Sequence, residues 1–153
     1  MQALLDIKEY FVDELSVRTN HDFSKKDQST GEIKVDFDIK RNNTSPLEFM
    51  IPMTIAVNSS ESSFAVAEYQ ISLKLTGFFG FAEGTDEETI NRMIGPSGLA
   101  ILYGVARGVA AQATGNCWHG KFILPSMNFV EMLREKAKSE PAPGKRKKKA
   151  VAT

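Results

Sequence analysis

Residues 32–40 read Glu-Ile-Lys-Val-Asp-Phe-Asp-Ile-Lys and alternate strictly between apolar and charged side chains. A period of two places Ile33, Val35, Phe37 and Ile39 on one face of an extended chain, with the charged residues on the other. This pattern is typical of an antiparallel strand that has one face against a core and one face in solvent. The stretch therefore predicts that the fold is built on an antiparallel sheet.

Similar runs lie on both sides of this stretch. Leu47–Val57 alternates again, and Pro52 inside it predicts a sheet edge or a bulge because proline donates no ladder hydrogen bond. Residues 65–81 form a longer alternating run, whereas Ile7–Arg18 has apolar residues without strict alternation. Four strands in succession predict a meander, in which each strand pairs with the next along the chain.

The hydrophobic period becomes helical after residue 84. Residues 85–88 (Thr-Asp-Glu-Glu) predict a capping box, and residues 95–98 (Gly-Pro-Ser-Gly) are expected to end this first helix early. A second helix is expected over Leu99–Thr114, and a third from the cap Asn128 to about Ser139. Strands first and helices afterwards are typical of the α+β class. We expect a four-stranded antiparallel meander sheet followed by helices packed on one face.

The predicted helix over Leu99–Thr114 is apolar nearly all round, with Arg107 and Gln112 as its only long polar side chains. One sheet layer covers only one side of such a helix, so its other side is expected at a subunit interface. The predicted interface residues are Ile101, Leu102, Gly104, Val105, Gly108 and Val109.

The formal net charge of zero conceals an uneven distribution of charge. The chain has 153 residues with 19 basic and 19 acidic side chains, and Lys145–Lys149 supply five of the basic ones. Residues 1–140 therefore carry 14 basic and 19 acidic groups, a formal charge of −5. We expect a single domain over residues 1–140 and a disordered basic tail over residues 141–153. The tail lacks interleaved aromatics, so the pattern favours a solubilising segment over nucleic-acid binding.

The cysteine count, the first residues and the longest apolar stretch together predict the cellular compartment. Cys117 is the single cysteine, which allows no internal disulfide and fits a reducing compartment. The opening residues 1–6 lack the basic start and long apolar run of a signal peptide. The longest nearly apolar stretch, residues 98–111, is shorter than the roughly 20 residues of a bilayer crossing. We therefore expect a soluble cytoplasmic protein without membrane insertion.

The sequence offers little material for catalysis. Cys117 and His119 flank Trp118 and invite comparison with a thiol nucleophile or a metal site. A structural zinc site normally has four ligands, and the only other histidine, His21, is distant in sequence. A packed thiol and a surface histidine are the expected roles. We predict no catalytic residue, no metal and no cofactor, and hence no enzyme.

The order of these elements and their short sequence motifs resemble the SecB protein-export chaperone family over about residues 5–135. The individual motifs are short, and the resemblance depends on their order and spacing. The matching segments are Glu14-Leu15-Ser16-Val17, residues 32–37, Gly77-Phe78-Phe79, Asp86-Glu87-Glu88, residues 102–107 (Leu-Tyr-Gly-Val-Ala-Arg), Thr114-Gly115 and residues 124–129 (Leu-Pro-Ser-Met-Asn-Phe).

The resemblance implies a dimer of dimers with the apolar helix at the subunit interface. It also implies an ATP-independent holdase, a chaperone that holds unfolded polypeptide clients in apolar grooves. Phe78 lies on the opposite face of its strand from Phe79 and Phe81, so both faces of that strand need a cover. For each groove candidate, a core role is an equal alternative. The candidates are Phe78, Phe79, Phe81, Met93, Ile94, Trp118, Phe122, Ile123 and Met127.

Departures from the family pattern bear on protein export. Gly104-Val105 stands where the family usually has Pro-Tyr, and the tail is basic where export-linked members end in acids. Glu14 matches one acidic contact for the SecA motor, but Arg18 occupies what is commonly the other. The resemblance therefore implies the fold and client binding more directly than it implies SecA as a partner. Alternatives are an adaptor for one dedicated partner such as an antitoxin, and a nucleic-acid-associated protein using the tail.

Overall fold

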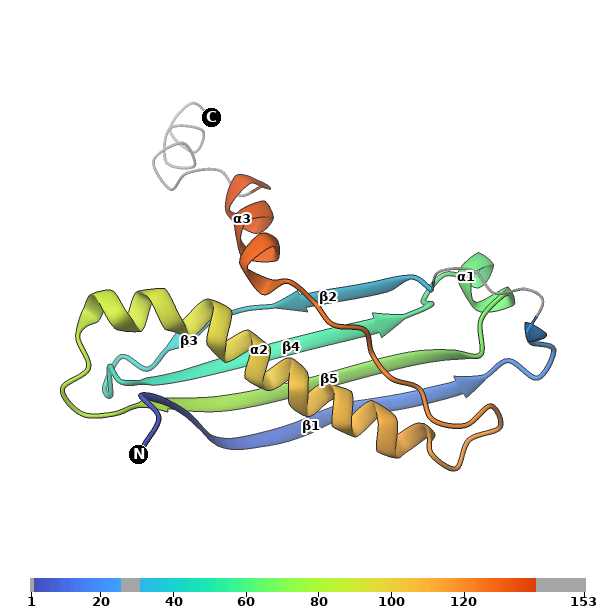
Figure 1. Cartoon of the computed structure of the whole chain (residues 1–153), viewed down its shortest axis with the longest axis horizontal. Coiled ribbons are helices and arrows are strands. Elements are labelled where there is room, and N and C mark those ends of the chain that lie inside the picture. The colour runs from blue at the N-terminus through green and yellow to red at the C-terminus, as the bar shows by residue number, and fades with distance from the viewer. Residues whose placement is uncertain (1, 26–30, 140–153) are drawn as a thin grey trace, which may run out of the picture.

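A single antiparallel sheet forms the base of the molecule, and a long helix crosses one of its faces (Figure 1). The computed structural model describes residues 2–25 and 31–139, so the predicted basic tail lies outside the described residues. The strands lie in the order β1-β5-β4-β2, and the short β3 also pairs with β4. They are β1 (Leu5–Thr19), β2 (Ile33–Phe37), β3 (Lys40–Arg41), β4 (Glu48–Val57) and β5 (Tyr69–Phe81).

The predicted α+β class and antiparallel sheet are confirmed, but β1 departs from a full meander. β2, β4 and β5 pair in succession, as a meander requires. β1 instead pairs with β5, from Leu5 opposite Phe81 to Thr19 opposite Tyr69. The long connection between β1 and β2 explains the difference. Only a short turn forces consecutive strands to be neighbours, and a longer segment can cross to the other edge of the sheet.

The edge or bulge predicted at Pro52 is wrong, because β4 lies inside the sheet and pairs with β5 without a register shift. The neighbouring strand breaks there instead. β2 ends at Phe37 and β3 begins at Lys40, and Pro52 on β4 lies opposite the gap between them. The backbone N–H of Asp38 donates to the Pro52 carbonyl at 3.1 Å. Proline has no N–H to return the bond, so β2 and β3 do not continue as one strand.

The predicted helix stop at residues 95–98 lies inside one continuous helix, α2 (Glu87–Thr114). Gly95 and Gly98 are buried in it, and a Cβ on Gly95 would lie 2.9 Å from the Leu133 side chain. The glycines therefore allow close packing and do not end the helix. A proline inside a helix costs a hydrogen bond, but packing of both halves on the same sheet compensates for it.

The N-cap of α2 is Asp86, one residue later than the predicted Thr85. The Asp86 carboxylate accepts a hydrogen bond from the Thr89 backbone N–H at 2.8 Å. Hydrogen bonds from Thr89 lower the pKa of Asp86 below its ordinary value, because they stabilise the ionised form. A carboxylate here also faces the positive end of the helix dipole.

Two shorter helices complete the fold. α3 (Phe129–Ser139) begins as predicted after Asn128, whose side chain accepts a hydrogen bond from the Glu131 backbone N–H at 3.1 Å. α1 (Glu61–Ala65) lies in the polar connection after β4 and is capped by Ser60. β5 therefore begins at Tyr69 and not near residue 65 as the alternation predicts.

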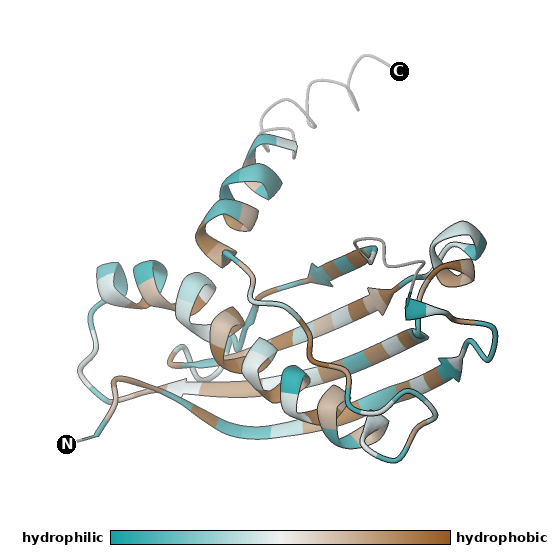
Figure 2. Ribbon diagram, turned by 45° about the vertical axis from the view of Figure 1, so that its right-hand side comes forward, coloured by the Kyte–Doolittle hydropathy of each residue, from teal (hydrophilic) through white to brown (hydrophobic). Residues whose placement is uncertain are grey.

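The core lies between α2 and one face of the sheet (Figure 2). Burying each large aliphatic side chain there contributes about 1.5–3 kcal/mol of stability. Leu102 is completely buried against the sheet, so its predicted place at a subunit interface is wrong. The apolar residues with no exposed surface in these two layers are Ile51, Ile55, Leu73, Leu99, Leu102, Ala106 and Ala110.

By length and composition alone, α2 could cross a membrane. From sequence, residues 98–111 were expected to be too short to cross a bilayer. That expectation rested on a helix stop at residues 95–98, whereas α2 is continuous through them. Core helices pass the same test, and one side of α2 is buried on the sheet.

Candidate functional site

The nine predicted groove residues do not form one site. Phe79, Phe81 and Ile94 are only 1%, 7% and 7% exposed and belong to the hydrophobic core. Met93 is half-buried and packs against the same core. The core alternative therefore holds for Phe79, Phe81 and Ile94, because their side chains point to the face of the sheet that α2 covers.

Four of the nine residues lie on the segment between α2 and α3, which we call the aromatic loop (residues 115–128). Trp118 is 73% exposed and Ile123 is 52% exposed. Phe122 and Met127 are half-buried and pack against the core. Figure 1 shows this loop at the end of the sheet where β1 finishes, and then passing across the sheet toward α3. The loop thus presents two large apolar side chains to solvent.

The buried hydroxyl of Tyr69 fastens the first part of the aromatic loop. It donates a hydrogen bond to the Gly120 carbonyl at 2.8 Å and accepts one from the His119 backbone N–H at 2.8 Å. Burial raises the pKa of Tyr69, because the phenolate would lose its hydration. Gly120 has a φ of 81°, which L residues rarely adopt. The tyrosine therefore holds a tight turn directly after Trp118.

His119 links the aromatic loop to the chain that follows β1. Its Nε2 lies 2.7 Å from the Asn20 carbonyl oxygen, the distance of a hydrogen bond. Its ring packs edge-on against Phe23, with centroids 5.3 Å apart. The Trp118 ring makes a similar contact with His21 at 5.1 Å. These ring contacts join the aromatic loop to the segment after β1, because His119 packs on Phe23 and Trp118 packs on His21.

Replacing Tyr69 with phenylalanine is expected to lower the free energy of unfolding by about 1–3 kcal/mol, because the His119 amide and the Gly120 carbonyl lose their partner. Chemical denaturation followed by circular dichroism measures this loss. Trp118 is the only tryptophan, so its fluorescence reports whether the loop has loosened. The control is Tyr10→Phe, at a half-exposed tyrosine. Equal stability of the two variants would contradict the anchoring role of Tyr69.

The second part of the aromatic loop is fastened to α2. The Tyr103 hydroxyl donates to the Pro125 carbonyl at 2.5 Å, and Arg107 Nε donates to the Leu124 carbonyl at 2.9 Å. Burial raises the pKa of Tyr103. Buried Thr114 accepts a hydrogen bond from the Phe122 backbone N–H at 2.8 Å. The hydrogen bonds fix the backbone of the loop while Trp118 and Ile123 remain exposed. The loop is therefore a pre-organised surface, which lowers the entropy cost of binding.

The Cys117 thiol and the His119 ring hydrogen-bond to different parts of the backbone and are not arranged as a catalytic pair. The Cys117 thiol donates to the Ala113 carbonyl at 3.3 Å, while the His119 ring turns toward Asn20. Within residues 2–25 and 31–139, no group of three or more His, Cys, Asp or Glu side chains could hold a metal ion.

Phe78 belongs to the opposite face of the sheet from α2, which we call the outer face. It is 37% exposed, and its ring meets Phe11 of β1 edge-on at 6.0 Å. Sequence reasoning predicted the opposite faces of Phe78 and Phe79 but missed Phe11. The signal was the apolar run Tyr10-Phe11-Val12, which places apolar side chains on both faces of β1.

The side of α2 turned away from the sheet carries most of the predicted interface residues. Gly104 and Gly108 are exposed, and a Cβ on either would meet nothing within 4 Å. The half-buried residues beside them are Ile101, Val105 and Val109.

Glu14, the predicted SecA contact, lies 3.5 Å from Lys74 Nζ, and both side chains are half exposed. Arg18 lies farther along β1, with its guanidinium 4.6 Å from the centre of the Phe64 ring. An exposed pair such as Glu14–Lys74 is worth only about 0–1 kcal/mol, so a partner could displace Lys74.

Comparison with known proteins places the chain in a family. Residues 1–140 match the family described as preprotein translocase subunit SecB. The chain belongs to the SecB family. Its SecB fold has the aromatic loop at one end of the sheet and a long α2 whose outward side is uncovered in the single subunit.

One solved structure shows a similar fold. The chain resembles a SecB-like chaperone of Mycobacterium tuberculosis, solved in complex with a ChAD peptide from the HigA1 antitoxin. The TM-score is 0.60 at 10% identity, covering 80% of this chain and 90% of that one. A protein of unknown function from Streptococcus agalactiae matches with a TM-score of 0.43 at 10% identity, covering 80% and 97%. No curated protein matches the sequence of the chain.

Proposed function

We propose that this SecB-family protein is an ATP-independent holdase that binds unfolded polypeptides through the aromatic loop. The observation that carries the proposal is the pair Trp118 and Ile123, exposed on a loop whose backbone is hydrogen-bonded at Tyr69, Tyr103 and Arg107. Exposed large apolar side chains gain roughly 25 cal/mol per Å² when a client covers them. Unfolded chains expose apolar segments that folded proteins bury, so the loop binds them selectively.

The direct test of this function is aggregation of a chemically denatured protein on dilution from denaturant. The SecB-family protein is expected to suppress light scattering at stoichiometric amounts without ATP. Several unrelated denatured proteins should be protected, because apolar contacts make few demands on shape. An equal amount of a folded protein without exposed apolar loops is the control. Unchanged aggregation of every denatured protein tested would contradict the proposal.

We propose that the functional form is a homotetramer built as a dimer of dimers through α2 and β1. The uncovered α2 residues Gly104 and Gly108 support this assembly, as does β1 at the edge of the sheet. Tyr10, Val12 and Leu15 pair with residues of β5 on the α2 side, and each is 41–50% exposed. Monomeric proteins rarely leave such a continuous apolar surface uncovered. Several loops in one assembly also raise the avidity for a long client.

A second candidate function is an adaptor for one dedicated partner, such as an antitoxin. The M. tuberculosis SecB-like chaperone, which binds an antitoxin peptide, supports this candidate. The number of unrelated clients decides between the two functions, because a dedicated adaptor protects only its partner. In either case we propose a cytoplasmic location, and we propose Glu14 as the contact if SecA receives the clients.

A further inference from the structure

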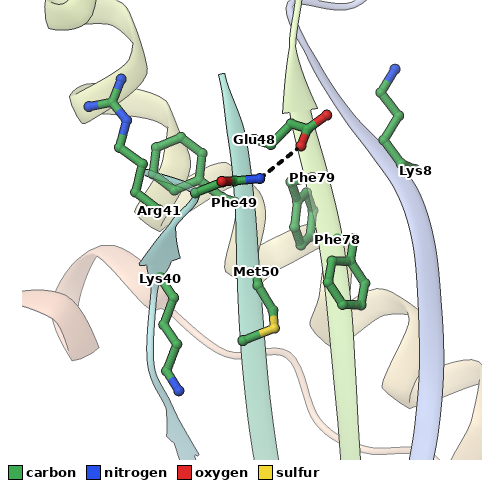
Figure 3. Close-up of a pocket in the computed structure, with 9 residues that line it drawn as sticks. Lys8, Lys40, Arg41, Glu48, Phe49, Met50, Phe78 and Phe79 are labelled. Atoms are coloured by element: carbon green, nitrogen blue, oxygen red, sulfur yellow. Dashed lines mark hydrogen bonds between the residues drawn. The ribbon is translucent and has the colours of Figure 1, made fainter. Parts of the chain in front are cut away.

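The outer face of the sheet contains a pocket of about 370 Å³, distant from the aromatic loop (Figure 3). It lies near the end of the sheet where β3 pairs with β4. Side chains alternate along a strand, so Met50 and Phe78 point to the opposite face from buried Ile51 and Phe79. Phe78 is 37% exposed, with Phe11 beside it. The pocket floor is therefore apolar and large enough for a bulky side chain.

Basic side chains border this apolar floor from two sides. Figure 3 shows Lys8 on β1 and Lys40 on β3, with Met50 and Phe78 between them. Lys8 Nζ lies 3.5 Å from Asp6, and both side chains are about two-thirds exposed, which makes a weak pair. Among the described residues, Lys40 has no ion pair. Both ammonium groups are thus open to a ligand.

The other charged residues of the pocket already have partners. Arg41 makes a two-pronged ion pair with Glu87 at the start of α2 and lies over the Phe49 ring. The hydrogen bonds from Arg41 lower the pKa of Glu87, which remains ionised at neutral pH. The carboxylate of Glu48, the only acid that lines the pocket, accepts a hydrogen bond from Asn42 at 3.2 Å. With Arg41 paired to Glu87, the two lysines outnumber the single carboxylate of Glu48, so the net charge at the rim is positive.

We propose that this pocket binds an extended peptide segment in which one large apolar residue is flanked by acidic residues. The apolar side chain occupies the floor of Met50 and Phe78, and the acidic side chains pair with Lys8 and Lys40. Charge complementarity of this kind selects the partner and speeds association. The inference goes beyond the holdase function, because the pocket lies on a different face from the aromatic loop and adds a preference for acidic sequence.

The test uses two fluorescent peptides that differ only in charge. One contains the core Asp-Glu-Phe-Glu-Asp between glycines, and its twin replaces each acid with the matching amide. Fluorescence anisotropy should show binding of the acidic peptide about tenfold tighter than its twin. The variant Lys8→Glu with Lys40→Glu should weaken binding of the acidic peptide by at least about tenfold. The control Lys34→Glu changes an exposed lysine on β2 and should leave the affinity for the acidic peptide unchanged.

Two results with the peptides and the lysine variant would overturn the proposal. One is equal affinity for the acidic and amide peptides, and the other is no effect of Lys8→Glu with Lys40→Glu. Lys8→Ala with Lys40→Ala should cause a smaller loss in the same direction, which excludes misfolding from reversed charge. A variant with serine at Trp118 and Ile123 should still bind the acidic peptide. Loss in that variant would place the peptide on the aromatic loop and would also overturn the proposal.

Discussion

Replacing Trp118 and Ile123 together with serine is expected to weaken binding of unfolded chains about 10- to 100-fold. A fully buried large apolar side chain contributes about 1.5–3 kcal/mol, and each of these two offers roughly half or more of its surface to a client. A tenfold change in affinity corresponds to 1.4 kcal/mol, so the combined loss reaches one to two orders of magnitude. Isothermal calorimetry with an unfolded client measures the change.

The same double variant should keep its fold, because neither side chain belongs to the core. The matched control is Leu4→Ser, which removes a side chain of similar exposure at the other end of β1. Circular dichroism and gel filtration check the fold and the assembly. If the double variant bound clients as tightly as Leu4→Ser, the aromatic loop would not be the client site. Unfolding of the double variant would instead show that the two residues stabilise the fold.

Replacing Gly104 and Gly108 together with glutamate is expected to dissociate the assembly and leave a folded subunit. A Cβ added at either position meets nothing within 4 Å beyond the neighbouring backbone of α2, so the first atom of the new side chain has room in the subunit. Across an interface, however, two carboxylates would be buried without a partner, which costs several kcal/mol. Light scattering on gel filtration should show the mass falling toward one subunit of 16.9 kDa.

Replacing Gly104 and Gly108 with alanine distinguishes an α2 that faces solvent from an α2 that lies at a subunit interface. On a solvent-facing helix, alanine is about 1 kcal/mol per residue more favourable than glycine, so the variant would be more stable. At a closely packed helix interface, the added methyl groups would separate the subunits and weaken assembly. Asn91→Glu, on an exposed position near the start of α2, is the control for added charge. A stabilised alanine variant with unchanged mass would contradict the α2 interface.

The sheet could be predicted from sequence to the extent that side chains alternate. In β2 and β4 the alternation gave the buried face residue by residue, but Pro52 breaks the neighbouring strand between β2 and β3 and not β4 itself. β1 has apolar side chains on both faces, so its pattern could not say which strand it pairs with. Strand order depends on where a long connection crosses the sheet, and no local pattern records that.

The helices show a similar limit. Gly95 and Gly98 read as a helix stop because glycine and proline weaken helices in isolation, yet their small size is what α2 needs against Leu133 and the sheet. An all-round apolar helix also hides which side faces its own sheet, so Leu102 was assigned to the wrong side. Trp118 and Ile123 could be named as candidates from sequence. Their exposure depends on hydrogen bonds from Tyr69, Tyr103 and Arg107, which lie elsewhere in the chain.

The central claim is that the protein distinguishes unfolded from folded chains. The most direct measurement is the affinity for one protein in its permanently unfolded form and in its native form, at about 0.15 M salt, where screening moderates surface charge effects. The proposed function predicts strong binding of the unfolded form, shared by several unrelated proteins, and little or no binding of the native form. Equal binding of both forms, or no binding of any unfolded chain, would contradict it.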